Sequence, residues 1–235
     1  IYCLLTKPRP NLIRDIIINV YVIQNTVISN IITNMSSLII ISAPSGTGKT
    51  SIVSALTESD SQLSLSISHT TRKPRPNEVE GQDYYFIGRD IFQAMANRGE
   101  FLESAEVYGN LYGTSHKWVK ESLASGQDVL MEIDYQGAQQ VRKTFPQVIS
   151  IFILPPSYEQ LEERLKQRGQ DDQKTISRRL ATVREEVSHL NEFDYVVINN
   201  ELQEAIKDVK CIIRAERLRV MRQLLNQRTL VAQFY

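Results

Sequence analysis

Residues 38–51, LIIISAPSGTGKTS, decide the fold. The run begins with four apolar residues that do not alternate with polar ones, which predicts a strand buried on both faces. A glycine-containing loop follows, and Lys49-Thr50-Ser51 begins an amphipathic helix. A strand, a glycine-containing loop, Lys-Thr and a helix in this order predict a phosphate-binding P-loop, whose backbone N–H groups hold anionic oxygens.

The P-loop residues have expected roles. Lys49 is expected to reach the β- and γ-phosphates of ATP, and the Thr50 hydroxyl a Mg²⁺ ion. Ala43 stands where the motif usually has its first glycine, and we expect it to be tolerated if its φ is negative. The alternative is a turn that only happens to spell GTGK, and the flanking strand and helix argue against it. The predicted ATP-binding residues are Ala43, Pro44, Ser45, Gly46, Thr47, Gly48, Lys49, Thr50 and Ser51.

Composition limits the classes of function. The 235 residues predict one or two domains with a sizeable core. Because 27 basic and 27 acidic residues cancel, no overall field favours nucleic acid or an anionic membrane. The two cysteines cannot form a disulfide framework, which fits the cytoplasm. The three histidines are widely spaced, which argues against a zinc enzyme.

Residues 1–34 differ from the rest of the chain. Their hydrophobic part, residues 16–32, is interrupted by Asn, Gln and Ser, so it is a poor candidate for a membrane-spanning helix. A signal peptide is an alternative, although no small-residue cleavage site stands out. Met35 is the first methionine and lies just before the P-loop strand. We therefore expect residues 1–34 to be an extension that is disordered or not part of the native domain.

Strands and helices alternate after the P-loop. Residues 127–134 and 148–154 are apolar runs typical of buried strands, residues 195–200 predict a last strand, and helical patterns lie between them. This alternation predicts an α/β fold with a mostly parallel sheet flanked by helices. Glu132 and Asp134 fall near the C-terminal end of their strand, which is where parallel sheets bind ligands.

Residues 68–115 predict a small inserted α+β unit. Its loop carries Arg72 and Arg75 between prolines, and guanidinium groups match phosphate oxygens in pairs. The alternative is a solvated basic loop. We also expect a strand at residues 81–87, and buried acidic side chains at Glu103 and Glu106.

Residues 160–180 predict a helical lid. Arginines flank a polar hairpin there, and a lid that closes over ATP is the favoured interpretation over a helix surface of Glu–Arg pairs. The arginine-rich segment 214–228 is interpreted as a solvated helix face or a contact surface.

These motifs together resemble the guanylate kinase family. The similar segments, in order, are SAPSGTGKTS, SHTTRKPRPNEVEGQDYYF, EFLESAEVYGNLYGT, EIDYQGAQQV, IFILPPS and RLKQRGQ, and the resemblance runs from about Ser37 to beyond Arg219. It implies that Ser68, Arg72, Arg75, Tyr84 and Tyr112 hold the GMP phosphate. It implies that Glu103, Thr114 and Asp134 read the guanine edge. The lid arginines would be Arg164, Arg168 and Arg179, and Asn199 would contact the adenine of ATP. Glu132 stands where the family can have Asp.

The resemblance implies transfer of the γ-phosphoryl group of ATP to GMP, and to dGMP, with Mg²⁺ as the cofactor. A GMP phosphate oxygen is already ionised near pH 7, so no general base is needed. The catalytic groups would be Lys49, Arg72, Arg164, Arg168 and Arg179, which neutralise two anions. Residues 35–67, 116–159 and 181–235 would form the core. The partners would be GMP and ATP, without nucleic acid or membrane, in the cytoplasm, as a monomer or a homo-oligomer.

Three alternatives remain. One is a kinase-like module that binds protein ligands and has lost catalysis, and another is a P-loop kinase for a different phosphorylated acceptor. The third is nucleic-acid binding by the arginine-rich C-terminal helix, which the neutral total charge weakens.

Overall fold

A computed structural model describes residues 36–167 and 173–234, all of which belong to the compact unit Met35–Tyr235. The predictions for residues 1–34 and for Arg168 lie outside these described residues. Within the described ranges, we find no helix that is long and apolar enough to span a membrane.

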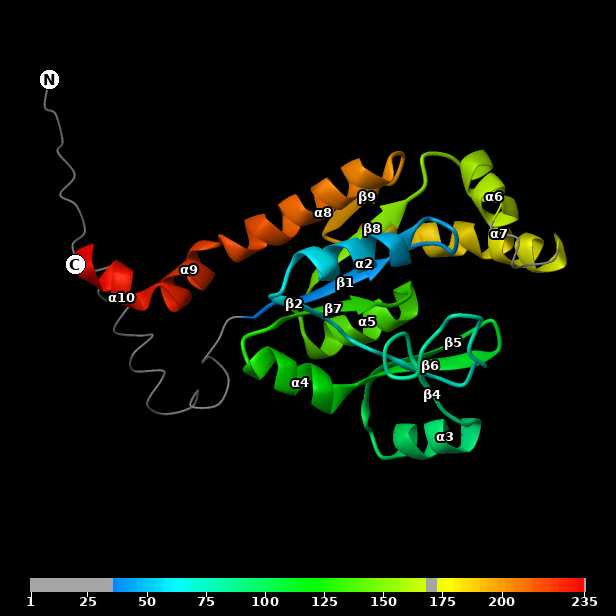
Figure 1. Cartoon of the computed structure of the whole chain (residues 1–235), viewed down its shortest axis with the longest axis horizontal. Coiled ribbons are helices and arrows are strands. Elements are labelled where there is room, and N and C mark those ends of the chain that lie inside the picture. The colour runs from blue at the N-terminus through cyan, green and yellow to red at the C-terminus, as the bar shows by residue number, and fades with distance from the viewer. Residues whose placement is uncertain (1–35, 168–172, 235) are drawn as a thin grey trace, which may run out of the picture. The chain divides into compact units, whose positions relative to one another are not determined.

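The central sheet contains five parallel strands, in the order β2 (Leu63–Leu65), β7 (Asp128–Glu132), β1 (Leu38–Ser42), β8 (Ile149–Leu154) and β9 (Tyr195–Ile198) (Figure 1). The P-loop strand β1 lies at the centre, and Ile39, Ile40 and Ile41 are fully buried. The predicted α/β class with a mostly parallel sheet is confirmed.

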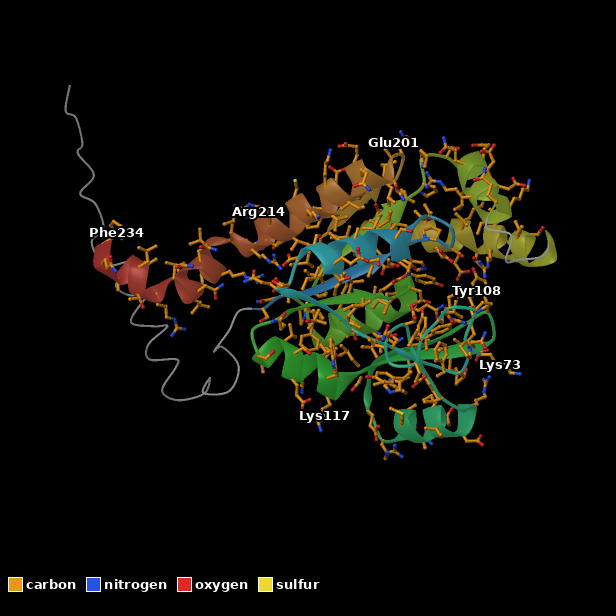
Figure 2. All side chains as sticks on the ribbon, in the orientation of Figure 1. Lys73, Tyr108, Lys117, Glu201, Arg214 and Phe234 are labelled. Atoms are coloured by element: carbon orange, nitrogen blue, oxygen red, sulfur yellow. The ribbon has the colours of Figure 1, made fainter. Side chains whose placement is uncertain are left out.

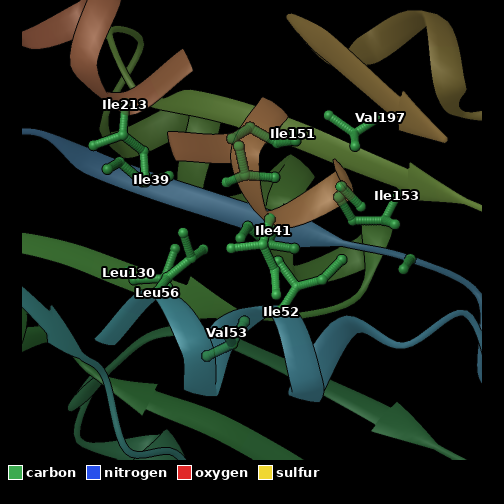
Figure 3. Packing of buried hydrophobic residues seen from close by; sticks show 14 of the residues in the cluster. Ile39, Ile41, Ile52, Val53, Leu56, Leu130, Ile151, Ile153, Val197 and Ile213 are labelled. Carbon is green, nitrogen blue, oxygen red and sulfur yellow. The ribbon is translucent and has the colours of Figure 1, made fainter. Parts of the chain in front are cut away.

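Helices cover both faces of this sheet, which explains why β1 is apolar at every position. Ile39 and Ile41 pack against helices α2 (Lys49–Ser59) and α8 (Leu202–Arg217), in the cluster that Figure 3 shows. Leu38 and Ile40 point to the opposite face and join the apolar cluster that includes residues of α4 (His116–Ala124) and α5 (Tyr135–Thr144). Successive side chains of a strand alternate between faces, so a strand covered on both sides needs apolar residues throughout.

A second sheet is formed by β4 (Tyr85–Phe86), β3 (His69–Thr70), β6 (Asn110–Ser115) and β5 (Phe101–Val107), in this order. Helix α3 (Arg89–Asn97) packs against it, with Phe92 stacked on Phe101. We call residues 68–115 the insertion. The strand expected at residues 81–87 is wrong in extent, because Gly81 has a φ of +74° and begins a turn whose backbone is held by the Asp83 carboxylate.

Helices α6 (Tyr158–Gln167) and α7 (Gln173–Ser188) share a small apolar cluster of their own, and we call them the lid helices. The short helix η1 (Leu190–Glu192) leads from α7 into β9. After α8 the described chain continues as α9 (Val220–Asn226), α10 (Arg228–Val231) and η2 (Ala232–Phe234).

The arginine-rich C-terminal segment is not simply a solvated face, as the sequence had suggested. Arg222 is only 9% exposed, and its Nη2 donates a 2.6 Å hydrogen bond to Asp128 Oδ1. Arg217 Nε donates to the other oxygen of the same carboxylate at 2.7 Å. Because Asp128 begins β7, the neighbour of β1 in the central sheet, these ion pairs attach the C-terminal helices to the sheet.

Candidate functional site

A cleft of about 590 Å³ lies at the C-terminal edge of the central sheet. Its walls come from the P-loop, the insertion, the residues after β7 and the lid helices. A volume of this size is typical of small-molecule sites. It lies where parallel sheets bind ligands, which is outside the carboxyl ends of the strands.

The P-loop backbone depends on two glycines. Gly46 and Gly48 have φ values of +90° and +96°, which side chains rarely allow. A Cβ at Gly46 would lie 2.8 Å from Leu165 Cδ2 of α6, so this lid helix packs directly on the loop. Ala43 has no such requirement, because its φ is not positive, which agrees with its tolerance at this position. The N-cap of α2 is Gly48, which has no side chain to compete with an anion for the first amides.

Lys49 and Thr50 contact the end of β7. Lys49 Nζ donates to the Ile133 carbonyl at 3.4 Å. The Thr50 hydroxyl donates to Glu132 Oε1 at 2.7 Å. A hydroxyl and a carboxylate oxygen are hard ligands of the kind that Mg²⁺ prefers, so this pair fits that ion.

Glu103 lies at the insertion side of the cleft and is 4% exposed. Its Oε1 accepts a 2.6 Å hydrogen bond from the Thr114 hydroxyl, and Ser68 Oγ lies 3.0 Å from the same hydroxyl. Burial raises the pKa of Glu103 to about 7, and the nearby Asp134 acts in the same direction, against the Thr114 hydrogen bond. The Thr114 hydroxyl therefore connects Ser68 to the Glu103 carboxylate.

Asp134 and Gly137 form the floor beside Glu103. Asp134 Oδ1 caps α5 by accepting from the Gly137 amide at 2.8 Å. A Cβ at Gly137 would lie 2.8 Å from Glu103 Oε2, so only glycine leaves room for the carboxylate there.

Arg72 is held in a fixed orientation in the insertion. Its two terminal nitrogens donate to both oxygens of Glu78 at 2.9 and 2.8 Å, and its guanidinium lies 5.3 Å from the centre of the Tyr84 ring. Burial disfavours the charge of Arg72, but the Glu78 contacts outweigh burial and raise its pKa above the ordinary value. Glu78 also accepts from the Arg75 amide at 2.7 Å. Tyr84 and Tyr112 pack edge to face beside them.

The lid helices contribute two of the predicted arginines to the cleft, Arg164 and Arg179. Arg164 Nη2 donates to the carbonyls of Asn199 and Asn200 at 3.1 and 3.3 Å. Arg179 Nη1 donates to the P-loop Ser45 hydroxyl at 3.3 Å.

Some predicted site residues lie behind the cleft wall. Asn199 is 4% exposed, and its Nδ2 donates to the Thr47 carbonyl at 2.7 Å. In this conformation Asn199 supports the P-loop and does not line the cleft, and Thr47 and Thr114 are likewise buried behind the lining residues. The prediction that Glu106 is buried is wrong: it lines the cleft with a side chain that is 54% exposed and pairs with Arg89 at 3.4 Å.

Sequence reasoning missed three contributors. Glu78, which orients Arg72, lies only six residues after it in the same loop. An ion pair between the two was the signal in the sequence that could have identified Glu78. Gln140 on α5 pairs with the backbone of Ser104, next to Glu103. The Gln140 side chain donates to the Ser104 carbonyl at 2.8 Å and accepts from the Ser104 amide at 3.1 Å. Glu186 of α7 lines the cleft, and burial raises its pKa to about 7, against the Thr182 hydrogen bond and the charge of Lys49. No local pattern marks Gln140 or Glu186.

Comparisons with known proteins agree on one family. The family model described as guanylate kinase matches residues 35–216. The guanylate kinase of Nitrosomonas europaea is 60% identical over 200 residues, which are 85% of this chain and all of that protein. The guanylate kinase of Nitrosospira multiformis is 56% identical over 201 residues, 86% of this chain and 96% of that protein. Among solved structures, the guanylate kinase of Anaplasma phagocytophilum is similar with a TM-score of 0.68 and 33% identity, over 80% of this chain and 90% of that one.

Proposed function

The chain belongs to the guanylate kinase family, and we propose on this premise how its residues transfer the γ-phosphoryl group of ATP to GMP. One observation carries the proposal: a single cleft holds the P-loop with Lys49 and, from the insertion, the buried carboxylate of Glu103. The P-loop suits the phosphates of a nucleoside triphosphate, and the Glu103 carboxylate suits a base that presents two neighbouring N–H donors.

Glu103 selects guanine in this proposal. Guanine presents N1–H and N2–H₂ as neighbouring donors, which one carboxylate accepts together, whereas adenine presents an acceptor at N1. Adenine would leave a carboxylate that is 4% exposed without its partners, which is a costly arrangement. Asp134, beside Glu103, supplies further acceptor oxygens at the same edge.

Arg72, Arg75, Tyr84 and Tyr112 bind the GMP phosphate, with Ser68 at the start of the same loop. The support is that these side chains line the cleft and that Glu78 already holds the Arg72 guanidinium in place. A guanidinium that is fixed before the substrate arrives loses little conformational entropy on binding.

Phosphoryl transfer requires positioning and charge neutralisation. The nucleophile is a GMP phosphate oxygen, which is ionised near pH 7 because the second pKa of a phosphate is about 6. Lys49, Arg164 and Arg179 surround the position of the γ-phosphate and stabilise the charge that spreads over it in the transition state. Arg168 and the adenine contact of Asn199 remain proposals from the family resemblance.

Thr50 and Glu132 would hold Mg²⁺. Among the described residues, no group of three or more His, Cys, Asp or Glu side chains gathers as a metal site, and Mg²⁺ in kinases takes substrate phosphates and water as its other ligands. When bound there, the ion would supply positive charge that neutralises the phosphates of ATP.

Three further points belong to the proposal. dGMP is also accepted, because the guanine contacts do not involve the ribose. The insertion (68–115) moves against a core of residues 35–67, 116–159 and the part of 181–235 that follows Ser188. The lid, predicted at residues 160–180, extends to Ser188 in this proposal, because α7 runs unbroken from Gln173 to Ser188. The enzyme works in the cytoplasm on ATP and GMP, without nucleic acid or membrane, and the low cysteine content supports that location.

A coupled assay of the full chain tests the proposal, with ATP and Mg²⁺ against GMP, dGMP, AMP, UMP and dTMP. Turnover confined to the guanine nucleotides supports it. Binding of GMP without turnover would favour the binding module, and neither binding nor turnover would favour another acceptor. A second assay of the chain that begins at Met35 tests whether residues 1–34 are dispensable.

Two lysine variants test the P-loop assignment. Lys49→Met keeps the apolar stem but removes the charge, and it should lower kcat by at least about 100-fold. Lys117→Met is the matched control, because Lys117 lies on the solvent side of α4 with 83% of its side chain exposed (Figure 2). An unchanged kcat in Lys49→Met would refute the assignment.

A further inference from the structure

A hydrogen bond joins the insertion to the lid helices. The Tyr108 hydroxyl lies 3.2 Å from the Thr182 hydroxyl, although the two residues are 74 positions apart in the sequence. Tyr108 occupies the turn between β5 and β6, and Thr182 lies on α7. In Figure 2 Tyr108 lies between the tip of this hairpin and α7.

The direction of this hydrogen bond follows from proton counting. The Thr182 hydroxyl has one proton and two other acceptors within reach, the Arg179 carbonyl at 2.8 Å and Glu186 Oε1 at 3.2 Å. Because Thr182 gives its proton to one of these, its oxygen accepts the proton of Tyr108. The contact therefore connects the insertion, through Thr182, to Arg179 and Glu186 of the lid helix α7.

The backbone of Tyr108 is an independent sign of a function for this residue. Tyr108 and Gly109 form a two-residue hairpin turn with φ values of +51° and +84°. Such turns favour Asn, Asp or Gly at both positions, because other side chains are strained at positive φ. A bulky tyrosine in this place is an outlier, and outliers of this kind cluster at functional sites.

The Tyr108 ring also contacts a lid arginine. The Arg179 guanidinium lies 5.7 Å from the centre of the ring, and the same guanidinium donates to Ser45 of the P-loop. A cation at this distance from an aromatic ring is attracted to its face. The ring thus forms one side of the space in which Arg179 reaches the ATP loop.

The contact joins an element that binds GMP to an element that binds ATP in the function proposed above, and the following inference rests on that function. The β5–β6 hairpin carries Glu103 and Tyr112, which face GMP, and α7 carries Arg179, which faces ATP. We propose that Tyr108 is a positioning residue that latches the insertion to the lid through Thr182 and aligns Arg179 with the ATP phosphates. GMP binding, which fixes the hairpin, thereby favours the lid position that completes the ATP site.

Three substitutions separate the hydroxyl from the ring. Tyr108→Phe removes the hydroxyl and keeps the ring, Thr182→Val removes the partner hydroxyl and keeps the shape, and Tyr108→Leu removes the ring as well. Tyr85→Phe is the matched control, because Tyr85 belongs to the same sheet, is 38% exposed and stacks on His69 outside the cleft lining.

Kinetics give the first readout. Tyr108→Phe and Thr182→Val should each lower kcat/KM for ATP by about 3- to 10-fold at saturating GMP, the loss expected for one hydrogen bond. The Tyr108→Phe/Thr182→Val double variant should lose no more than the more affected single variant, because both changes remove the same contact. Tyr108→Leu should lower kcat/KM for ATP more than Tyr108→Phe does, since Arg179 also loses its contact with the ring. A double variant whose loss is the product of the single losses, or single variants within twofold of wild type, would overturn the latch.

Amide hydrogen exchange gives a second readout that does not depend on turnover. Thr182→Val should speed exchange in the hairpin at residues 107–110, across the interface from the substitution, and Tyr108→Phe should speed exchange in α7. Equal exchange in both segments would overturn the latch. A wild-type chain that does not phosphorylate GMP would refute the proposed function instead, so the two failures are distinguishable.

Discussion

The Thr114 hydroxyl donates a 2.6 Å hydrogen bond to Glu103 Oε1, at a position where Glu103 is only 4% exposed. One oxygen of the carboxylate is thereby bound within the insertion sheet, and burial raises the pKa of Glu103 to about 7. A substrate that brings two N–H donors satisfies the ionised form. The ligand therefore supplies the hydrogen-bond donors that the Glu103 carboxylate lacks within the insertion.

Glu103→Gln should therefore weaken guanine recognition. The amide has the same shape, but its NH₂ group meets donors of guanine where the carboxylate offered acceptors. We expect kcat/KM for GMP to fall by about 5- to 150-fold, which corresponds to about 1–3 kcal/mol for an unpaired buried polar group. Steady-state kinetics on GMP and AMP measure the change in selectivity. Glu100→Gln, a 41% exposed side chain at the edge of the same sheet, should leave both values unchanged. Equal losses in the two variants would contradict the role of Glu103.

The pKa of Glu103 predicts a pH dependence of GMP use. Below its pKa of about 7 the carboxyl is protonated and accepts the guanine donors poorly. We expect kcat/KM for GMP to fall roughly fivefold from pH 7 to pH 6 because of this group alone. The GMP phosphate and Glu186 titrate in the same range, so the measurement compares wild type with Glu103→Gln. The two profiles should converge at low pH, and parallel profiles would contradict the assignment.

The same pKa has a consequence for stability. Because the pKa of Glu103 in the folded protein, about 7, exceeds its ordinary value of 4.5, the folded state binds the proton more tightly than the unfolded state. The stability that this group contributes is complete below pH 4.5 and is lost as pH rises through 7. In thermal unfolding without ligand, wild type should thus lose more stability than Glu103→Gln between pH 5 and pH 8. An identical pH dependence in the two proteins would show that Glu103 titrates normally.

Gln140 positions the strand that carries Glu103. Its side-chain amide makes two hydrogen bonds to the backbone of Ser104 and so attaches β5 to α5. Gln140→Leu should raise KM for GMP by about 5-fold for each hydrogen bond lost, with kcat for bound substrate nearly kept, because Gln140 touches no reacting atom. Gln93→Leu on the exposed side of α3 is the control. A fall in kcat at unchanged KM for GMP would exclude this positioning role.

The sequence was sufficient for the fold and for much of the cleft because those features follow from local patterns. The apolar run 38–41 predicts a strand covered on both faces, and the loop GTGKT after it predicts a helix start. The cleft-lining arginines Arg72 and Arg164 were identified from short motifs. Each of these inferences uses residues within about ten positions of one another.

The features that the sequence did not reveal depend on contacts between distant segments. Asn199 donates a hydrogen bond to the Thr47 carbonyl under the P-loop, because the end of β9 meets Thr47 only in the folded sheet. Tyr108 and Thr182 meet across two separate elements. Periodicity carries no information about such pairs.

The C-terminal helices provide the last test, because the buried Asp128 carboxylate accepts hydrogen bonds from Arg217, Arg222 and the Ser37 amide. Asp128→Asn leaves the Arg222 side chain, which is 11% exposed, without its anion, and leaves Arg217, 21% exposed, with only that of Asp60. We expect the free energy of unfolding in urea to fall by about 3–5 kcal/mol, the range for breaking a buried ion pair.

Asp60→Asn is the control for this prediction, because Asp60 pairs with the same Arg217 but is 26% exposed, and its loss should cost only about 1 kcal/mol. Asp128 begins β7 and Glu132 ends it, so the substitution lies roughly 13 Å from the cleft end of the strand, and kcat at 20 °C or so should not change. If the arginines only formed a solvated face, Asp128→Asn would unfold at the same urea concentration as Asp60→Asn. A lower midpoint with normal kcat would instead establish that Arg217 and Arg222 hold the C-terminal helices to the sheet.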